Sequence, residues 1–454
     1  MALVESFSGI RGIYGLELNR DVVKKYGYSY IEFIKKRNQN PKIVIGRDSR
    51  HSGEEISNLL KDVLNCEILD VGILPTPLIE NAVRTTCSDG GIIITASHNE
   101  PEYNGFKFLD KDGALIRPKD SELIIKRFHE INIGDIQLSK NLKVKDYHME
   151  AIQDYKKLLK TILKTDKIIL DTKIIVDSNG GAGYISKEIF EDYSIKAIYL
   201  NNEIGKFKRL IEPKEESLKY LKEELEKNDA EFAAGFDCDA DRVEILLKDG
   251  RIVTGNDILA LISNEILSEK TELLKSIVVN DATSYLVKEM ALKNNATFHE
   301  VEVGEINIVD EMDRLDSQIG GEGSNGGIII PPSKCRDGIL TILILMKIIE
   351  KYKKSLSELI YELPKYYYLK EKIRLKEEFS LLKPEIKRYY INQGYEILET
   401  GDISGGLKAI KNNSWIWFRQ SKTEDKILRV ISDSPFYEIS NKLINEAREL
   451  LNVK

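Results

Sequence analysis

The sequence predicts an α/β protein built from several units, and three observations support this fold class. Short β-branched runs alternate with helical periodicity over most of the chain, and this alternation restarts near residues 173 and 277. In each unit a strand ends in a polar loop rich in Gly or Asp, the place where α/β sheets bind ligands. With 454 residues, the chain is long enough for about three or four domains.

The first unit begins with a buried strand predicted at residues 42–45, after which apolar residues recur at helical spacing from Gly53. Two more apolar runs, at 67–71 and 91–95, predict strands. The second of these runs stops in a polar loop. This order of elements is typical of a β-α-β unit.

The second and third units repeat this order. The predicted strands are 173–177, 197–200, 232–235, 277–280 and 297–301; the predicted helices are 215–227, a helix from Ser284, 306–314 and 338–350; and turns are expected at 180–183 and 319–327. After Pro364 the order of predicted strands and helices changes. We expect a helical stretch from the tyrosines at 366–368 to about residue 393, then short strands at 415–418 and 427–431, which together form a smaller α+β domain.

Composition excludes several classes of protein. The 67 basic and 74 acidic residues leave a net charge of −7, which gives no basic surface for nucleic acid or for an anionic membrane. The longest apolar runs, such as 339–346, are far shorter than a membrane span, and the N-terminus has no signal peptide pattern, so a cytoplasmic protein is expected. The four cysteines are scattered and are expected to be buried, reduced thiols.

The first loop with chemically functional side chains is the serine loop, residues 95–99 (Thr-Ala-Ser-His-Asn). Ser97 follows an apolar strand and is flanked by hydroxyl, imidazole and amide groups, a setting suited to a nucleophile. The alternative is a helix N-cap, which Ser and Asn also favour. Acyl transfer is disfavoured because no G-x-S-x-G turn is present.

The metal loop, residues 237–242, carries Asp237, Asp239 and Asp241. Three carboxylates at this spacing repel one another unless a cation lies among them, and oxygen ligands favour a hard ion such as Mg²⁺. Arg242 can hold a phosphoryl oxygen beside that ion. A solvated acidic turn is the alternative.

Two further loops suit a sugar phosphate. Glycines at 320–327 surround Glu322, Ser324 and Asn325, whose side chains can bind hydroxyl groups; a plain turn is the alternative. Residues 419–424 form a candidate phosphate cradle, or else an ordinary polar hairpin loop. Its candidate ligands are Arg419, Ser421, Lys422 and Thr423. The four loops together indicate phosphoryl transfer on a sugar phosphate.

On these motifs the sequence resembles the α-D-phosphohexomutase superfamily over nearly its whole length. The matching segments are 8–12, 46–50, 95–99 with 103–107, 237–242, Glu322 with Ser324, and Arg419 with Ser421 and Thr423. The resemblance implies three similar α/β domains with mixed sheets and a smaller C-terminal α+β domain. The expected domains are 1–150 with the serine loop, 151–253 with the metal loop, 254–365 with the sugar loop and 366–454 with the phosphate loop.

The resemblance also implies the reaction. Ser97 would carry a phosphoryl group, Mg²⁺ would be bound by the three aspartates and a phosphate oxygen on Ser97, and a hexose 1,6-bisphosphate would be both intermediate and activator. Arg11 and Lys107 would lie beside the transferring group, with His98 next to the serine. Asn325, Arg242 and Lys422 join the residues expected to bind substrate.

This sequence departs from the family pattern in several places, and residues 207–213 match the Phe-Pro loop of the family's second domain poorly. The sugar loop has no His after Ser324, so we expect Lys107, and less readily His98, to transfer the proton. Cys238 replaces a usual Gly, which requires a backbone angle that is not reserved for Gly. Lys422 and Asp425 stand where Gly and Pro are common.

Several readings stay open at this point. A broad phosphoglucomutase/phosphomannomutase is expected first and a phosphoglucosamine mutase second, as a monomer or a homodimer. A Mg²⁺-dependent phosphatase with a serine nucleophile explains the serine and the aspartates but leaves the phosphate cradle without a role. A sugar-phosphate-binding protein without activity is a third class, and the intact serine and metal loops argue against it.

Overall fold

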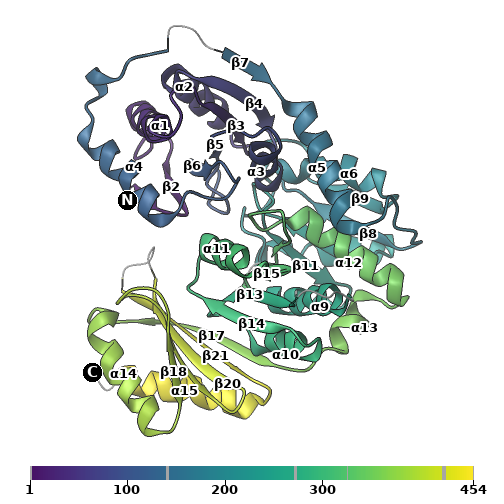
Figure 1. The fold of residues 1–454 in the computed structure, drawn as a ribbon. Helices are drawn as coiled ribbons and strands as arrows, with labels where there is room; N and C mark the ends of the chain where they lie inside the picture. Colours follow the sequence, from purple (N-terminus) through teal and green to yellow (C-terminus); the bar gives the residue numbers. More distant parts are fainter. Residues whose placement is uncertain (1–2, 140–142, 270–273, 325, 422–425, 453–454) are drawn as a thin grey trace. The chain divides into compact units, whose positions relative to one another are not determined.

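The chain forms two compact units in a computed structural model that describes residues 3–139, 143–269, 274–324, 326–421 and 426–452 (Figure 1). Unit 1 comprises residues 1–253 and 325–356, and unit 2 comprises residues 254–324 and 357–454. The boundaries of the four expected domains stay a prediction. Each unit is described below by itself.

The first sheet of unit 1 has the strand order β1-β2-β6-β5-β3-β4-β7 and contains both parallel and antiparallel pairs. Apolar side chains of α1, α2 and α4 pack on one of its faces, where Tyr26 and Phe128 stack with ring centroids 3.9 Å apart. Gly46 of β3 leaves room for Ile79 of α3. The elements are β1 Val4–Ser6, β2 Gly9–Ile13, α1 Arg20–Lys35, β3 Lys42–Arg47, α2 Gly53–Leu64, β4 Glu67–Ile73, α3 Thr76–Thr85, β5 Gly90–Ile94, β6 Tyr103–Asp110, α4 Pro118–Glu130, the 3₁₀ helix η1 Ile133–Asp135 and β7 Lys143–Asp146.

The second sheet of unit 1 has the order β12-β11-β10-β8-β9. Its central strand β10 runs parallel to β8 and antiparallel to β11, so the loop from β10 to β11 leaves the carboxyl end of β10. The remaining elements of unit 1, in this sheet or outside it, are α5 His148–Leu163, β8 Lys173–Asp177, the 3₁₀ helix η2 Ala182–Ile185, α6 Ser186–Asp192, β9 Lys196–Leu200, α7 Glu215–Leu218, α8 Leu221–Asn228, β10 Phe232–Phe236, β11 Val243–Leu247, β12 Ile252–Val253, β16 Ile328–Ile329 and α12 Gly338–Tyr352.

Unit 2 begins with the parallel strands β14, β13 and β15, in this order across the sheet. Because β13 and β15 are parallel neighbours, the residues after their carboxyl ends lie at one edge. β15 occupies the start of the expected turn at 319–327, so that turn begins only after Gly321. The elements are α9 Gly255–Ser268, β13 Ser276–Asn280, α10 Tyr285–Lys293, β14 Thr297–Val301, α11 Glu305–Leu315 and β15 Ile319–Gly321.

The rest of unit 2 is an antiparallel sheet in the order β17-β21-β20-β19-β18. The helix expected from residue 366 is wrong at its start, because 367–374 form strand β17. Leu369 and Ile373 of β17 are partly buried while Lys370 and Lys372 are exposed, an alternation with the period of a strand. The elements are α13 Leu356–Tyr361, which begins on the last residue of unit 1, β17 Tyr367–Arg374, α14 Phe379–Asn392, β18 Glu396–Glu399, β19 Leu407–Lys411, β20 Ser414–Gln420, β21 Ile427–Ser434 and α15 Tyr437–Asn452.

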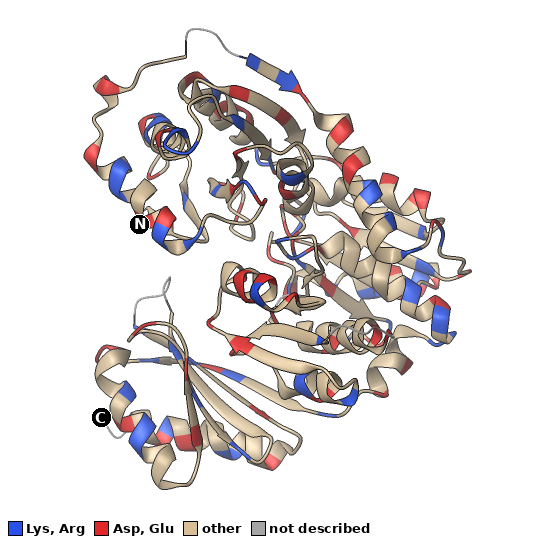
Figure 2. Cartoon of the chain, in the orientation of Figure 1, with Lys and Arg blue, Asp and Glu red and all other residues tan. Residues whose placement is uncertain are grey.

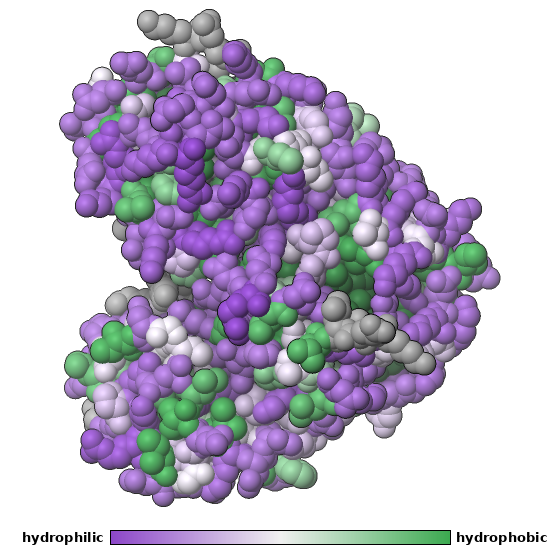
Figure 3. All heavy atoms as spheres, in the orientation of Figure 1, coloured by the Kyte–Doolittle hydropathy of each residue, from purple (hydrophilic) through white to green (hydrophobic). Residues whose placement is uncertain are grey.

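Charges of both signs are mixed along the described chain (Figure 2), and hydrophilic residues dominate the face in Figure 3. No helix among the described residues combines the length and apolarity that a bilayer crossing requires. All four cysteines are free thiols. Cys238 and Cys335 are buried, whereas Cys66 is partly buried and Cys87 is exposed, so the expectation of four buried thiols is wrong for those two.

Candidate active site

The serine loop begins directly after the buried strand β5. Ser97 is 2% exposed, and its Oγ donates to Asp237 Oδ2 at 3.2 Å and lies 3.4 Å from His98 Nδ1. Its φ of +51° is in the left-handed region, which costs a residue other than Gly about 1–2 kcal/mol. Ser97 is therefore held in a conformation that the surrounding contacts impose, and it is not the cap of a regular helix.

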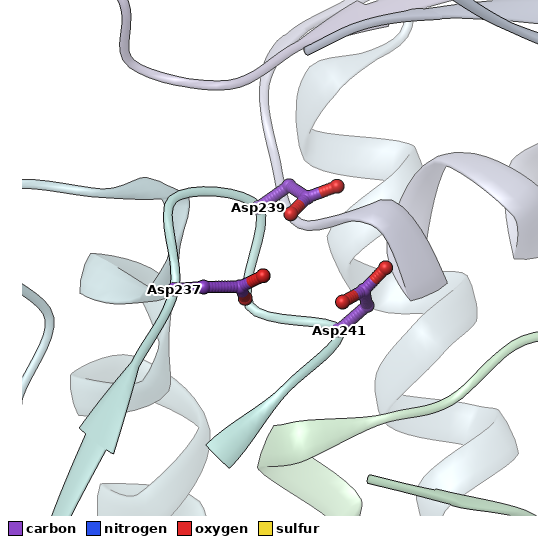
Figure 4. Close-up of side chains that lie close together, drawn as sticks. All are labelled: Asp237, Asp239 and Asp241. Atoms are coloured by element: carbon purple, nitrogen blue, oxygen red, sulfur yellow. The ribbon is translucent and has the colours of Figure 1, made fainter. Parts of the chain in front are cut away.

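The metal loop follows strand β10, and its three aspartates turn their carboxylates toward a common space (Figure 4). Asp237, Asp239 and Asp241 are each at most 1% exposed, and one oxygen from each lies within 4.8 Å of the others. The sharp turn is made by Ala240, whose φ is +52°, and not by Cys238. Cys238 is therefore compatible with the loop although Gly is usual there.

The donor set of this cluster fits a divalent cation. Among the described residues, Asp239 Oδ1 and Asp241 Oδ1 are buried without a hydrogen-bond partner. Burial and the neighbouring charges of Asp241 and Asp239 raise the pKa of Asp237 well above its usual range. Oxygen atoms that repel one another and lack donors are the ligands that hard cations prefer. The cluster can therefore hold a metal ion.

Lys107 enters the cluster from strand β6. Its Nζ donates to Asp239 Oδ2 and to Asp241 Oδ2, each at 2.8 Å, and Thr76 Oγ1 also donates to Asp239 Oδ2 at 2.8 Å. Burial by itself raises the pKa of Asp241, but Lys107, Arg336 and Arg242 outweigh it and hold this pKa well below the usual range. Lys107 therefore forms an ion pair with two of the three carboxylates.

Guanidinium groups surround the same carboxylates. Arg242 Nε lies 3.9 Å from Asp237 Oδ2 and 3.8 Å from Asp241 Oδ1, and Arg336 Nη2 lies 3.9 Å from Asp241 Oδ2. Arg11 is electrostatically coupled to Arg242 and to Asp241. With Lys107, four cations face three carboxylates, an excess of positive charge that suits an anion.

The pKa of His98 is affected by this positively charged environment. Burial, followed by the charges of Arg242 and Arg11, lowers the pKa of His98 to about 2. The imidazole is therefore neutral near pH 7 and presents one unprotonated nitrogen.

Arg336 is the cation of this cluster that the sequence did not predict. It is 6% exposed and lies between β16 and α12, almost one hundred residues after the metal loop. No spacing rule connects it to the aspartates. The signal in the sequence is a single Arg directly before Asp337, which caps α12 by accepting from Leu340 N at 2.9 Å.

The expected sugar-binding residues lie in unit 2, where Glu322 directly follows β15. Glu322 is 8% exposed, and its Oε1 accepts from Asn280 Nδ2 at 3.0 Å. Gly323 N donates to Thr283 Oγ1 at 3.2 Å, and a Cβ at residue 323 would meet Asn256 Oδ1 at 1.8 Å. Glycine is therefore required at 323, and this close packing fixes the backbone next to Glu322. Ser324 is exposed, and Asn325 lies outside the described residues.

Arg419, the first residue of the expected phosphate cradle, ends strand β20 in unit 2. It is 9% exposed, and its Nη2 donates to Glu302 Oε1 at 2.8 Å. Among the described residues, Arg419 Nε is buried without a hydrogen-bond partner. The backbone N–H of Ser421 donates to Ile427 O at 2.7 Å and closes the hairpin between β20 and β21. Lys422, Thr423 and Asp425 lie outside the described residues.

Comparisons with known proteins agree with this fold. Residues 5–133 match the family model of phosphoglucomutase/phosphomannomutase alpha/beta/alpha domain I, and residues 254–367 match that of domain III. A phosphoglucomutase/phosphomannomutase of Thermococcus kodakarensis is 32% identical over 97% of this chain and 98% of its own length. A phosphoglucosamine/phosphogalactosamine mutase of Sulfurisphaera tokodaii is 28% identical over 98% of each chain.

Among solved structures, a phosphoglucomutase/phosphomannomutase family protein of Burkholderia thailandensis superposes with a TM-score of 0.84 and 21% identity, covering 100% of this chain and 98% of its own. The chain belongs to the phosphoglucomutase/phosphomannomutase family of the α-D-phosphohexomutase superfamily. It is a phosphohexomutase, an enzyme of the isomerase class.

Proposed function

We propose that this enzyme interconverts hexose 1-phosphates and hexose 6-phosphates through a phosphoserine at Ser97 and a hexose 1,6-bisphosphate, with glucose and mannose as the first expected sugars. The observation that supports it most is the buried Ser97 hydroxyl, 3.2 Å from Asp237 in a cluster of three carboxylates and four cations. A dianionic phosphoryl group on Ser97 would meet this positive excess directly.

The proposed cofactor is Mg²⁺, held by Asp237, Asp239, Asp241 and a phosphate oxygen on Ser97. When bound, the ion supplies charge neutralisation to the phosphoryl group. Arg11, Lys107 and Arg242 would then donate to the oxygens of that group, and Arg336 would extend the same set.

Lys107 and His98 stay the two candidates for proton transfer in this proposal. Lys107 is the first candidate from the sequence, and its Nζ donates to Asp239 and Asp241 beside Ser97. His98 Nδ1 is 3.4 Å from Ser97 Oγ, and its lowered pKa makes it the weaker base of the two candidates.

Substrate binding is assigned to the residues of unit 2. Glu322, Ser324 and Asn325 would hold sugar hydroxyls, and Arg419, Ser421, Lys422 and Thr423 would hold the phosphate that does not react. The buried Arg419 supports this assignment, because its Nε carries a donor for a phosphate oxygen. A hexose 1,6-bisphosphate would serve as the activator that loads Ser97.

Glucosamine phosphate is the alternative substrate, since the Sulfurisphaera tokodaii relative is named for amino sugars. The test offers the 1-phosphates of glucose, mannose and glucosamine in parallel, with Mg²⁺ and catalytic glucose 1,6-bisphosphate. We expect 6-phosphates that Ser97→Ala abolishes and that Ser88→Ala, a buried serine beside Thr86 on another loop, leaves unchanged. Release of inorganic phosphate without any 6-phosphate would overturn the mutase in favour of a phosphatase.

A further inference from the structure

A buried arginine, Arg50, lies directly under the serine loop. It is 1% exposed, and its guanidinium donates to three backbone carbonyls of that region. Nη2 donates to Ser97 O at 2.8 Å and to Asn99 O at 2.6 Å, and Nη1 donates to Glu100 O at 2.7 Å. One planar side chain therefore fixes the path of the backbone from residue 97 to residue 100.

The third nitrogen of the guanidinium, Nε, connects it to the other side of the loop. Arg50 Nε donates to Asp48 Oδ2 at 3.0 Å, and the same oxygen accepts from Thr95 Oγ1 at 2.7 Å. Thr95 Oγ1 in turn accepts from Ser97 N at 2.8 Å. The chain of contacts thus starts at the carbonyl of Ser97 and returns to its N–H.

This closed network fixes the backbone of Ser97 and leaves its side chain as the part that can react. Its backbone N–H and C=O are both occupied while its φ is in the left-handed region, so the loop cannot relax without losing several buried hydrogen bonds. The side-chain Oγ is the polar atom that remains available, and it points to Asp237 and His98.

We propose that Arg50 is a positioning residue for phosphoryl transfer at Ser97, a role that rests on the proposed function of Ser97. Arg50 acts through the backbone of the serine loop. It keeps Ser97 Oγ in one place while the phosphoryl group leaves and returns, because a displacement of about 1 Å from the reactive geometry can lower the rate about 100-fold.

The geometry requires arginine and not merely a positive charge. A lysine at residue 50 could keep the ion pair with Asp48, but its single ammonium has no planar fork to reach three carbonyls at once. The same device recurs beside the metal loop. Arg209 Nε donates to Asp177 Oδ2 at 2.6 Å, and its Nη2 donates to the carbonyl of Phe236, the residue before Asp237, at 2.7 Å. Next to each reactive loop, an arginine that pairs with an aspartate therefore donates to backbone carbonyls.

The test compares Arg50→Lys with Arg84→Lys, a partly buried arginine on α3 that donates to Asn81 Oδ1 at 2.9 Å. We expect Arg50→Lys to lower kcat about 100-fold and to change KM by less than about threefold. Amide hydrogen exchange of a peptide covering 97–101 should become at least about tenfold faster. Arg84→Lys should keep the wild-type kcat and the wild-type exchange in this peptide, even where its melting temperature falls as far.

A second variant guards against misfolding of the first. Thr95→Val removes the link between Asp48 and the Ser97 N–H at nearly constant volume, and we expect a smaller loss of kcat, about tenfold, with the same faster exchange at 97–101. The proposal is overturned if exchange at 97–101 is unchanged in both variants. It is equally overturned if kcat falls by the same factor in Arg84→Lys.

Failure of the proposed function gives a different result. In that case the wild-type enzyme converts none of the three sugar phosphates, whereas the exchange experiment still reports whether Arg50 holds the loop.

Discussion

The region around Ser97 in unit 1 and the region around Arg419 in unit 2 differ in how their charges are satisfied. In unit 1, Lys107 is bound by two carboxylates and Arg50 by one carboxylate and three carbonyls. In unit 2, Arg419 shares one carboxylate, Glu302, and keeps a buried Nε without a partner among the described residues. The first region is held in one geometry, whereas in the second, under the proposed function, a substrate phosphate exchanges with a carboxylate.

The largest expected effect tests the fixed region. Asp239→Asn should lower kcat about 1000-fold and weaken Mg²⁺ binding at least about tenfold, because it removes one ligand and one partner of Lys107. Metal affinity is measured by titrating Mn²⁺ and following the electron paramagnetic resonance signal of the free ion. Asp229→Asn, an exposed acid paired with Lys248, is the matched control. Unchanged Mn²⁺ affinity in Asp239→Asn would show that the aspartates do not form the metal site.

A buried acid from each unit gives a prediction on pH. Asp337 of unit 1 accepts from Tyr155 Oη at 2.7 Å, and Asp433 of unit 2 accepts from Tyr285 N at 2.7 Å; burial raises the pKa of each to about 6. Since the folded pKa exceeds the unfolded value of 3.8, protonation favours the folded state. Stability from each group is full below about pH 4 and falls by about 3 kcal/mol as the pH rises through 6.

Asp337→Asn and Asp433→Asn should each remove this fall. Relative to the wild-type protein, each variant gains unfolding free energy between pH 4 and pH 6.5, measured by urea titration at both pH values. Asp171→Asn, which replaces an exposed acid whose pKa Lys196 lowers, should show no such gain. A parallel pH dependence of variant and wild type would contradict the assignment.

The two regions also differ in how much of them the sequence could predict. Ser97 and the three aspartates each follow an apolar strand, so their place at a strand end followed from periodicity and from local composition. The roles of Arg50 and Arg336 could not be predicted in this way, because they depend on tertiary contacts with loops 47 and 95 residues away in the chain. Local patterns report which residues end a strand, and they do not report which distant side chain binds there.

The C-terminal part of unit 2 shows the same limit for secondary structure. Residues 367–374 carry so many charges that their period of two is weak in the sequence, and we expected a helix. These residues form a strand because all eight of them pair with β21. The partner that supplies those backbone hydrogen bonds lies about sixty residues further on, where no local rule can find it.

Arg419→Lys tests the region around Arg419, where the bound anion is expected to exchange. Loss of the planar fork should raise KM for the hexose phosphate about 30-fold and lower kcat by less than about threefold, because the lysine cannot bind a phosphate through two nitrogens. Arg429→Lys, on the neighbouring strand and in register with Arg419, is the control and should keep the wild-type KM. A loss confined to kcat would place Arg419 at the reacting phosphate instead.

The smallest expected effect is a decrease in KM, opposite to the increase expected for Arg419→Lys. Glu302 holds Arg419 Nη2 at 2.8 Å, so a phosphate must replace a carboxylate that is already bound. Glu302→Gln keeps the shape of the side chain but removes its charge, which weakens the competitor by about 1 kcal/mol and should lower KM about fivefold with kcat unchanged. Glu311→Gln, whose carboxylate pairs with the exposed Arg314, is the control. If KM rises instead, Glu302 orients Arg419 for the substrate, and the contrast between a fixed and an exchangeable region disappears.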